Sequence, residues 1–334
     1  MGERIKRQHY VPQGYLRRFQ SPNSNKKVAR IWVVDRNIEQ PFNVPIQTVS
    51  SRDGFYDSEI DESIAEFDRH GLENLLRIEE EKFYAALEII DSAIIENRVI
   101  PDNAKPAIAW YMYLQFIRTE KFRAGIGTPS NSQHPDFQKL TQIYGLIDKK
   151  TSSKFLNVCL SSFWIIYEMV GEQTVFTSDN PVVFSFDSEN PMLSHYLLKR
   201  DIGFMPNMGM KMVFPIDSKH ILVLYDKLHF PEKADIDNLI VPFDTSEAYS
   251  VWSTIINNCD RQIYLDRNDG MAEIIKMLMG LDETLKPIRD IIGKVFEAIR
   301  YDNSAVSGTR LNSFSAYQKT VLLKNALNKL DSGQ

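Results

Sequence analysis

The chain is poor in cysteine and has no long hydrophobic run. Its 334 residues include two cysteines, Cys159 and Cys259, both in apolar or helical surroundings, so we expect buried, reduced thiols. The longest apolar run, Phe163–Val170, is interrupted by a glutamate and is far shorter than the about 18 residues of a membrane span. The basic N-terminus lacks the apolar segment of a signal peptide. These absences predict a cytoplasmic protein without membrane contact.

Basic charge and the common motifs of enzyme sites are also missing. The formal net charge is -5 at pH 7, so no global positive field indicates binding to nucleic acid. There is no glycine-rich phosphate loop, no His-Glu-x-x-His pair, no paired Cys-x-x-Cys and no Gly-x-Ser-x-Gly turn. The sequence therefore assigns no nucleotide cofactor. A divalent metal stays open, and the oligomeric state is not predicted.

The order of predicted elements indicates one large α+β domain. Strand-like segments fill residues 1–56, a charged helical part follows over 57–150, strands return over 151–265 and helices fill 266–334. Strands and helices do not alternate regularly, which argues against a doubly wound parallel sheet. We expect a mixed, mainly antiparallel sheet packed against a central buried helix, with a helical C-terminal region.

Two pairs of apolar segments predict β-hairpins in the second half of the chain. The first joins Ser162–Met169 to Thr174–Ser178, and the second joins Lys211–Pro215 to His220–Tyr225. The first hairpin runs into the polar sequence Thr177–Pro181, which lies between two apolar stretches. Polar side chains at strand ends are frequent in binding sites. We therefore place the candidate site at this turn.

A single arginine stands out in the predicted central helix. The segment Ala104–Arg123 is apolar on nearly every face up to Gln115, and Asp102 or Asn103 is expected to cap it. Arg118 lies within this segment. An arginine in such a helix is expected to meet a ligand or a partner side chain, unless the helix end reaches water.

Four motifs in the chain are shared with a known family. The sequence resembles a mostly bacterial family known only as a domain of unknown function (DUF 4238). Its members look alike in a His-Tyr-Val-Pro start, a Tyr-Leu-x-x-Phe continuation, an Arg-Thr pair and a Thr-Ser-Asp-Asn-Pro turn. Here these are His9–Pro12, Tyr15–Phe19, Arg118-Thr119 and Thr177–Pro181. The resemblance covers roughly Lys6 to Leu265 and implies positions, with no established activity.

The resemblance implies that His9, Arg118 and Asp179 belong to one site. A histidine, an arginine and an aspartate together suit a phosphate-bearing ligand, with Arg118 on the anion, His9 as acid or base, and Asp179 orienting His9 or holding a metal. The further ligand-binding candidates are Arg17, Arg18, Ser178, Asn180 and Asn257. The leading hypothesis is a hydrolase of phosphodiester or nucleotide bonds, with a defence-associated nuclease as one form of it.

Other interpretations stay open. The chain could be a nucleotide-binding, protein-binding or sensor module without catalysis. Arg118 and Asp179 could instead form a buried structural pair, and Asp179 could simply stabilise a turn. We interpret the acidic run Glu79–Glu81 as a solvated helix face rather than a metal site. Tyr111, like its aromatic neighbours Trp110 and Tyr113, is expected to pack in the core rather than stack on a base.

Overall fold

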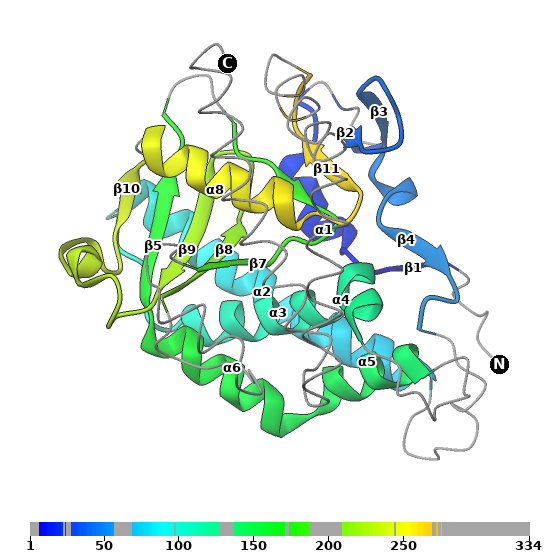
Figure 1. Cartoon of the computed structure of the whole chain (residues 1–334), viewed down its shortest axis with the longest axis horizontal. Helices are drawn as coiled ribbons and strands as arrows, with labels where there is room; N and C mark the ends of the chain where they lie inside the picture. The colour runs from blue at the N-terminus through cyan, green and yellow to red at the C-terminus, as the bar shows by residue number, and fades with distance from the viewer. Residues whose placement is uncertain are drawn as a thin grey trace, which may run out of the picture.

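The computed structural model describes most of the chain from residue 7 to residue 268. The described residues are 7–22, 24, 28–56, 69–96, 98–126, 137–170, 174–186, 209–243, 245–268, 272 and 275. Within them the chain forms helices and β-sheets of two, five and four strands (Figure 1). The α+β fold class predicted from the sequence is confirmed. The helices predicted near the C-terminus lie almost entirely outside the described residues.

The N-terminal segment pairs briefly with a strand and then turns into the core. Strand β1 is antiparallel to β4, with His9 opposite Ser51. Two short helices follow and bury Tyr15, Leu16 and Phe19, in agreement with their helical spacing in the sequence. The elements of this region are β1 (Arg7–His9), α1 (Gln13–Leu16), η1 (Arg17–Phe19), η2 (Ile46–Thr48) and β4 (Ser51–Asp53).

The largest sheet has five strands in the order β10-β5-β9-β8-β7. Strands β10 and β5 are parallel and all other neighbours are antiparallel, so the sheet is mixed and mainly antiparallel, as predicted. The hairpin predicted for Lys211–Pro215 and His220–Tyr225 is confirmed. The strands are β5 (Phe163–Glu168), β7 (Val183–Phe186), β8 (Met210–Pro215), β9 (His220–Tyr225) and β10 (Ile240–Pro242).

A smaller antiparallel sheet has the order β3-β2-β11-β6. Its strands are β2 (Arg30–Asp35), β3 (Phe42–Pro45), β6 (Thr177–Ser178) and β11 (Gln262–Leu265). The hairpin predicted between Ser162–Met169 and Thr174–Ser178 is wrong, because β5 lies between β9 and β10 while β6 pairs with β11. Strand β5 is apolar at five successive positions, so both of its faces require cover in the interior of the large sheet.

The predicted central helix is two helices. Helix α3 (Lys105–Ile117) begins after Ala104, which caps it without a side-chain hydrogen bond, so the caps predicted at Asp102 or Asn103 are wrong. Thr119 has an extended backbone, and its hydroxyl accepts a hydrogen bond from the amide of Phe122 at 3.2 Å, which starts helix α4 (Glu120–Gly125). The other helices are α2 (Arg69–Glu96), α5 (Phe137–Ile147), α6 (Lys149–Ser161), α8 (Thr245–Asn258) and the 3-10 helix η4 (Pro231–Ile236).

Helix α3 is buried between the other helices and the large sheet. In Figure 1 the helices α3 and α6 lie below the five-stranded sheet, and α8 crosses its upper end. The Tyr111 ring of α3 stacks on Phe83 of α2 with centroids 3.6 Å apart, and lies 6.1 Å from the ring of Phe214 on β8. The prediction that a central buried helix packs against the sheet is therefore correct.

Both cysteines are buried and neither forms a disulfide. Burial raises the pKa of the Cys259 thiol to about 11 and raises that of Cys159 as well. Two protonated, inaccessible thiols agree with the predicted core role. None of the helices in the described part of the chain combines the length and apolar character that a membrane span requires.

Candidate functional site

Arg118 lies at the C-terminal end of α3 with 4% of its surface exposed. Its Nη1 donates to Oε1 of Glu80 at 2.8 Å and its Nη2 donates to the carbonyl oxygen of His9 at 2.9 Å. Its Nε donates to the hydroxyl of Tyr56 at 3.3 Å. Arg118 therefore forms an ion pair and joins three segments, and a direct role in ligand binding stays a prediction.

The partner of Arg118 comes from the acidic run that the sequence placed on a solvated face. The Glu80 side chain is only 24% exposed and is paired with Arg118, so that interpretation was wrong for this residue. The sequence carried a usable signal. Glu80 lies four residues after Leu76 and three before Phe83, both buried, and is therefore on the apolar stripe of α2.

His9 is half-buried on β1 beside the Arg118–Glu80 pair. Burial lowers the pKa of its imidazole, and the positive charges of Arg7 and Arg118 lower it further. The backbone of Gln47 lies close enough to the imidazole to oppose this shift. The Nε2 atom is buried and has no hydrogen-bond partner among the described residues. At neutral pH, Nε2 is thus an unpaired acceptor.

Asp179 is buried, and its carboxylate binds three successive backbone amides. Oδ1 accepts from the amide of Asp260 at 2.8 Å, and Oδ2 accepts from those of Arg261 and Gln262 at 2.7 and 2.8 Å. Burial and the nearby charge of Asp260 raise the pKa of Asp179 to about 6, although the three donors favour the ionised form. Asp179 holds the start of β11, so it does not form the structural pair with Arg118 that the sequence left open.

The residues around Asp179 tie the turn to two helices. Ser178 is buried, and its hydroxyl bonds the carbonyl and the amide of Asn180 at 2.9 and 3.1 Å. The Nδ2 of Asn180 donates to the carbonyl of Asn258 at 3.0 Å, and its Oδ1 accepts from the hydroxyl of Thr119 at 3.4 Å. Asn257 is buried near the end of α8. For Ser178 and Asn180 these contacts explain a structural role, and ligand binding stays a prediction.

The four shared motifs meet in space through contacts that the sequence did not predict. Tyr15 is fully buried, and its hydroxyl bonds Thr177 Oγ1 and the carbonyl of Pro215, each at 2.8 Å. The carbonyl of Tyr10 accepts from Nε2 of Gln115 at 2.9 Å. The N-terminal segment thus lies between α3 and the turn Thr177–Pro181, with His9 and Arg118 in contact and Asp179 facing β11.

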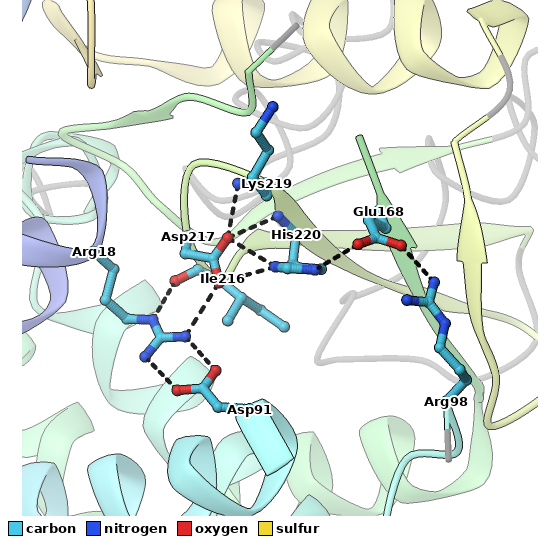
Figure 2. A network of polar contacts seen from close by, with 8 residues as sticks. All are labelled: Arg18, Asp91, Arg98, Glu168, Ile216, Asp217, Lys219 and His220. Atoms are coloured by element: carbon cyan, nitrogen blue, oxygen red, sulfur yellow. Dashed lines mark hydrogen bonds and ion pairs between the residues drawn. The ribbon is translucent and has the colours of Figure 1, made fainter. Parts of the chain in front are cut away.

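The two predicted arginines of η1 differ in their surroundings. Arg17 is exposed. Arg18 binds both carboxylate oxygens of Asp91, at 3.0 and 2.6 Å, and donates from Nη2 to Asp217 at 3.2 Å. Figure 2 shows this network continuing through Asp217 and His220. The guanidinium of Arg18 is therefore bound within a structural network, whereas the side chain of Arg17 is exposed.

The network of Figure 2 has a histidine between two carboxylates. His220 Nδ1 lies 2.9 Å from Oδ1 of Asp217, and its Nε2 lies 3.7 Å from Oε1 of Glu168. Arg98 donates to Oε2 of Glu168 at 2.6 Å. Each of the two carboxylates is thus also bound by an arginine, Asp217 by Arg18 and Glu168 by Arg98. The network joins η1, β5 and β9. No local pattern in the sequence indicates this network, because its members lie far apart in the chain.

Burial raises the pKa of the Tyr10 hydroxyl, and Ser50, Glu120 and Arg52, which no motif of the sequence indicated, lie close enough to shift it as well. Ser50 has a backbone φ of 48°, and its hydroxyl lies 2.6 Å from that of Tyr264. Burial raises the pKa of the Glu120 carboxyl, although Arg52, with which it forms an ion pair, lowers it.

Within the described ranges, no group of three or more His, Cys, Asp or Glu side chains is arranged to hold a metal ion.

Comparison with known proteins agrees with the motif resemblance. No curated protein and no solved structure matches the chain. A family model does match, over residues 7–269, which is more than half of the chain and includes all four motifs. The chain belongs to the family described as "Protein of unknown function (DUF4238)".

Proposed function

We propose that this protein binds a phosphate-bearing small ligand, most simply a nucleotide, beside His9 and hydrolyses its phosphoester bond. The observation that carries the proposal is the imidazole of His9. This imidazole is neutral near pH 7, and its buried Nε2 forms no hydrogen bond with any described residue. A neutral imidazole with a free lone pair is suited to act as a general base.

The chemistry follows from that atom. Nε2 takes a proton from a water molecule as the water oxygen attacks phosphorus. The bond from phosphorus to the leaving oxygen breaks, and that oxygen receives the proton from the imidazolium. His9 therefore ends the cycle unchanged, and the reaction consumes one water.

The charge for the phosphate is proposed to come from Arg17 rather than Arg118. The charge of Arg118 is already matched by Glu80 at 2.8 Å. Arg17 is exposed, and its guanidinium forms no hydrogen bond or ion pair with any described residue. Tyr84 is near both Arg17 and the Arg118–Glu80 pair, because the charges of all three residues act on its hydroxyl.

A purified-protein assay tests this proposal. The substrates are bis(4-nitrophenyl) phosphate, nucleoside triphosphates and short RNA and DNA strands, each with and without Mg²⁺ or Mn²⁺. We expect turnover that falls at least 100-fold in His9→Gln, a loss typical of removing a general base. The matched control is His229→Gln, in the turn after β9. Equal turnover by wild type and His9→Gln would remove His9 from the reaction.

One observation favours a second candidate, a binding or sensor module. Of the three residues predicted to form the reaction centre, Arg118 and Asp179 already have protein partners, and His9 alone offers an unpaired atom among the described residues. Saturable nucleotide binding without product would favour this alternative. A cytoplasmic location is part of both proposals, and it is supported by two buried thiols without a disulfide.

A further inference from the structure

The interface between α2 and α3 contains buried polar atoms without partners. Tyr111 is 1% exposed and Gln115 is fully buried. The hydroxyl of Tyr111 and Oε1 of Gln115 form no hydrogen bond with any described residue. Tyr111, Gln115 and Arg118 follow one another at spacings of four and three, so they lie on one face of α3. The unpaired atoms therefore lie one and two turns before Arg118 on the face of α3 that carries it.

Such atoms are unusual in a packed interior. Most buried donors and acceptors in proteins are paired with protein or with bound water, since leaving one unpaired costs free energy. Here two lie on adjacent turns of one helix, and the free Nε2 of His9 is a third in the same region. Tyr111 and His9 are both within electrostatic range of Glu80 and Arg118. One bound molecule could satisfy several of them together.

The contacts define which chemistry would fit. Nε2 of Gln115 donates to the carbonyl of Tyr10 at 2.9 Å, which orients the amide and leaves Oε1 as an acceptor. The Tyr111 hydroxyl can donate or accept. The Nε2 atom of His9 is left for the attacking water of the proposed reaction. Arg118 and Glu80 neutralise each other at 2.8 Å. The missing partner is thus a neutral group with a hydrogen-bond donor for Gln115 and a second polar atom for the Tyr111 hydroxyl.

The position of the tyrosine hydroxyl is held by its ring. The Tyr111 ring is stacked on the ring of Phe83 with an interplanar angle of 3°. Its centroid lies 6.4 Å from that of the Tyr15 ring. An aromatic side chain packed in this way has little freedom to turn away. Its hydroxyl is therefore preorganised for a ligand atom.

We infer that Tyr111 and Gln115 bind a neutral donor-bearing group of the ligand, either the diol of a ribose or the amino group of a base. The inference rests on the proposed function, because it names the part of the nucleotide that lies inside the protein while Arg17 contacts the phosphate. It makes Tyr111 and Gln115 specificity-determining residues that no motif of the sequence indicated.

Calorimetric titration of the full chain tests the inference. The probes are adenosine 5′-monophosphate (AMP), its 2′,3′-dideoxy form, inosine 5′-monophosphate and inorganic phosphate. We expect wild type to bind AMP and Tyr111→Phe to bind it about tenfold more weakly, which corresponds to one lost hydrogen bond. Weaker binding of the dideoxy form identifies the diol, and weaker binding of the inosine form identifies the amino group. The matched control Tyr113→Phe, on the same helix, should leave affinity unchanged.

A stability measurement separates a ligand site from a site for structural water. Without ligand, Tyr111→Phe should unfold at the same urea concentration as wild type or a higher one, because the variant removes an unpaired hydroxyl. A clearly lower midpoint would mean that a structural water holds the hydroxyl, and would overturn the inference. Equal AMP affinity of wild type and Tyr111→Phe would overturn it while leaving the proposed function intact. If wild type binds neither AMP nor phosphate, the proposed function fails and the inference fails with it.

Discussion

Nη1 of Arg118 lies 2.8 Å from Oε1 of Glu80, and this pair connects the end of α3 to the middle of α2. Arg118 is also hydrogen-bonded to the carbonyl of His9, so three segments depend on one guanidinium. The two opposite charges cancel, so the pair adds no net charge at the centre of the candidate site. Its structural role can be measured apart from any ligand.

Replacing Arg118 with alanine is expected to lower the free energy of unfolding by about 3–5 kcal/mol, because it leaves a carboxylate and a carbonyl without their donor. Urea denaturation measures this loss. The matched control is Arg77→Ala, which removes an exposed pair with Glu81 on the same helix α2 and should cost less than about 1 kcal/mol. Equal losses in the two variants would show that the buried pair adds no stability.

Asp179 should make the protein less stable as the pH rises. Its pKa is raised to about 6 in the folded protein, from an ordinary value of 3.8, so the folded state binds the proton more tightly than the unfolded state. Stability from this group is complete below pH 4 and is lost as the pH passes 6. Between pH 4 and pH 7 wild type should lose about 3 kcal/mol relative to Asp179→Asn.

The measurement is the pH dependence of the urea midpoint for wild type, Asp179→Asn and the exposed control Asp53→Asn. The comparison uses slopes, because the asparagine also disturbs the three amide contacts and shifts the whole curve. Parallel curves for wild type and Asp179→Asn would show that the Asp179 carboxyl has the same pKa in the folded and the unfolded protein, which would contradict the prediction.

His9 should act in the opposite direction. Its pKa lies below the ordinary value of 6.5 in the folded protein, so the unfolded state binds the proton more tightly. Stability from this group is present above pH 6.5 and is lost as the pH falls through the folded pKa. Wild type should therefore lose stability on acidification below pH 6.5 relative to His9→Gln. Thermal unfolding at pH 7.5 and 5.5 checks this, and a difference of the opposite sign would contradict the burial argument.

The Tyr15 hydroxyl is expected to be important for stability. Tyr15→Phe leaves the buried hydroxyl of Thr177 and the carbonyl of Pro215 without a partner, which should cost about 1–3 kcal/mol. Tyr144→Phe, at a tyrosine that is 64% exposed, is the control and should change stability by less than about 0.5 kcal/mol. A neutral result for Tyr15→Phe would mean that water replaces the hydroxyl at no cost.

The parts predicted correctly were those with local signals. The hairpin of β8 and β9 joins neighbouring segments, and α3 has an apolar run long enough to identify a buried helix. The break at Thr119 was missed, because a threonine at that position acts as a cap only once the backbone is extended there. Helix α6 was also missed, since its first turns, Lys149–Lys154, are polar and its buried apolar side chains, Phe155, Val158 and Cys159, come only in its second half.

By itself, the sequence determined the fold class, the buried central helix, the family membership and the segments that meet at the candidate site. Only the tertiary structure decided what each polar residue does there. Glu80 rather than Asp179 pairs with Arg118, Asp179 holds the amides of β11, and His9 keeps a free nitrogen. Local periodicity is encoded in neighbouring residues, whereas a polar side chain takes the partner that folding places within hydrogen-bonding distance, and that partner can lie anywhere in the chain.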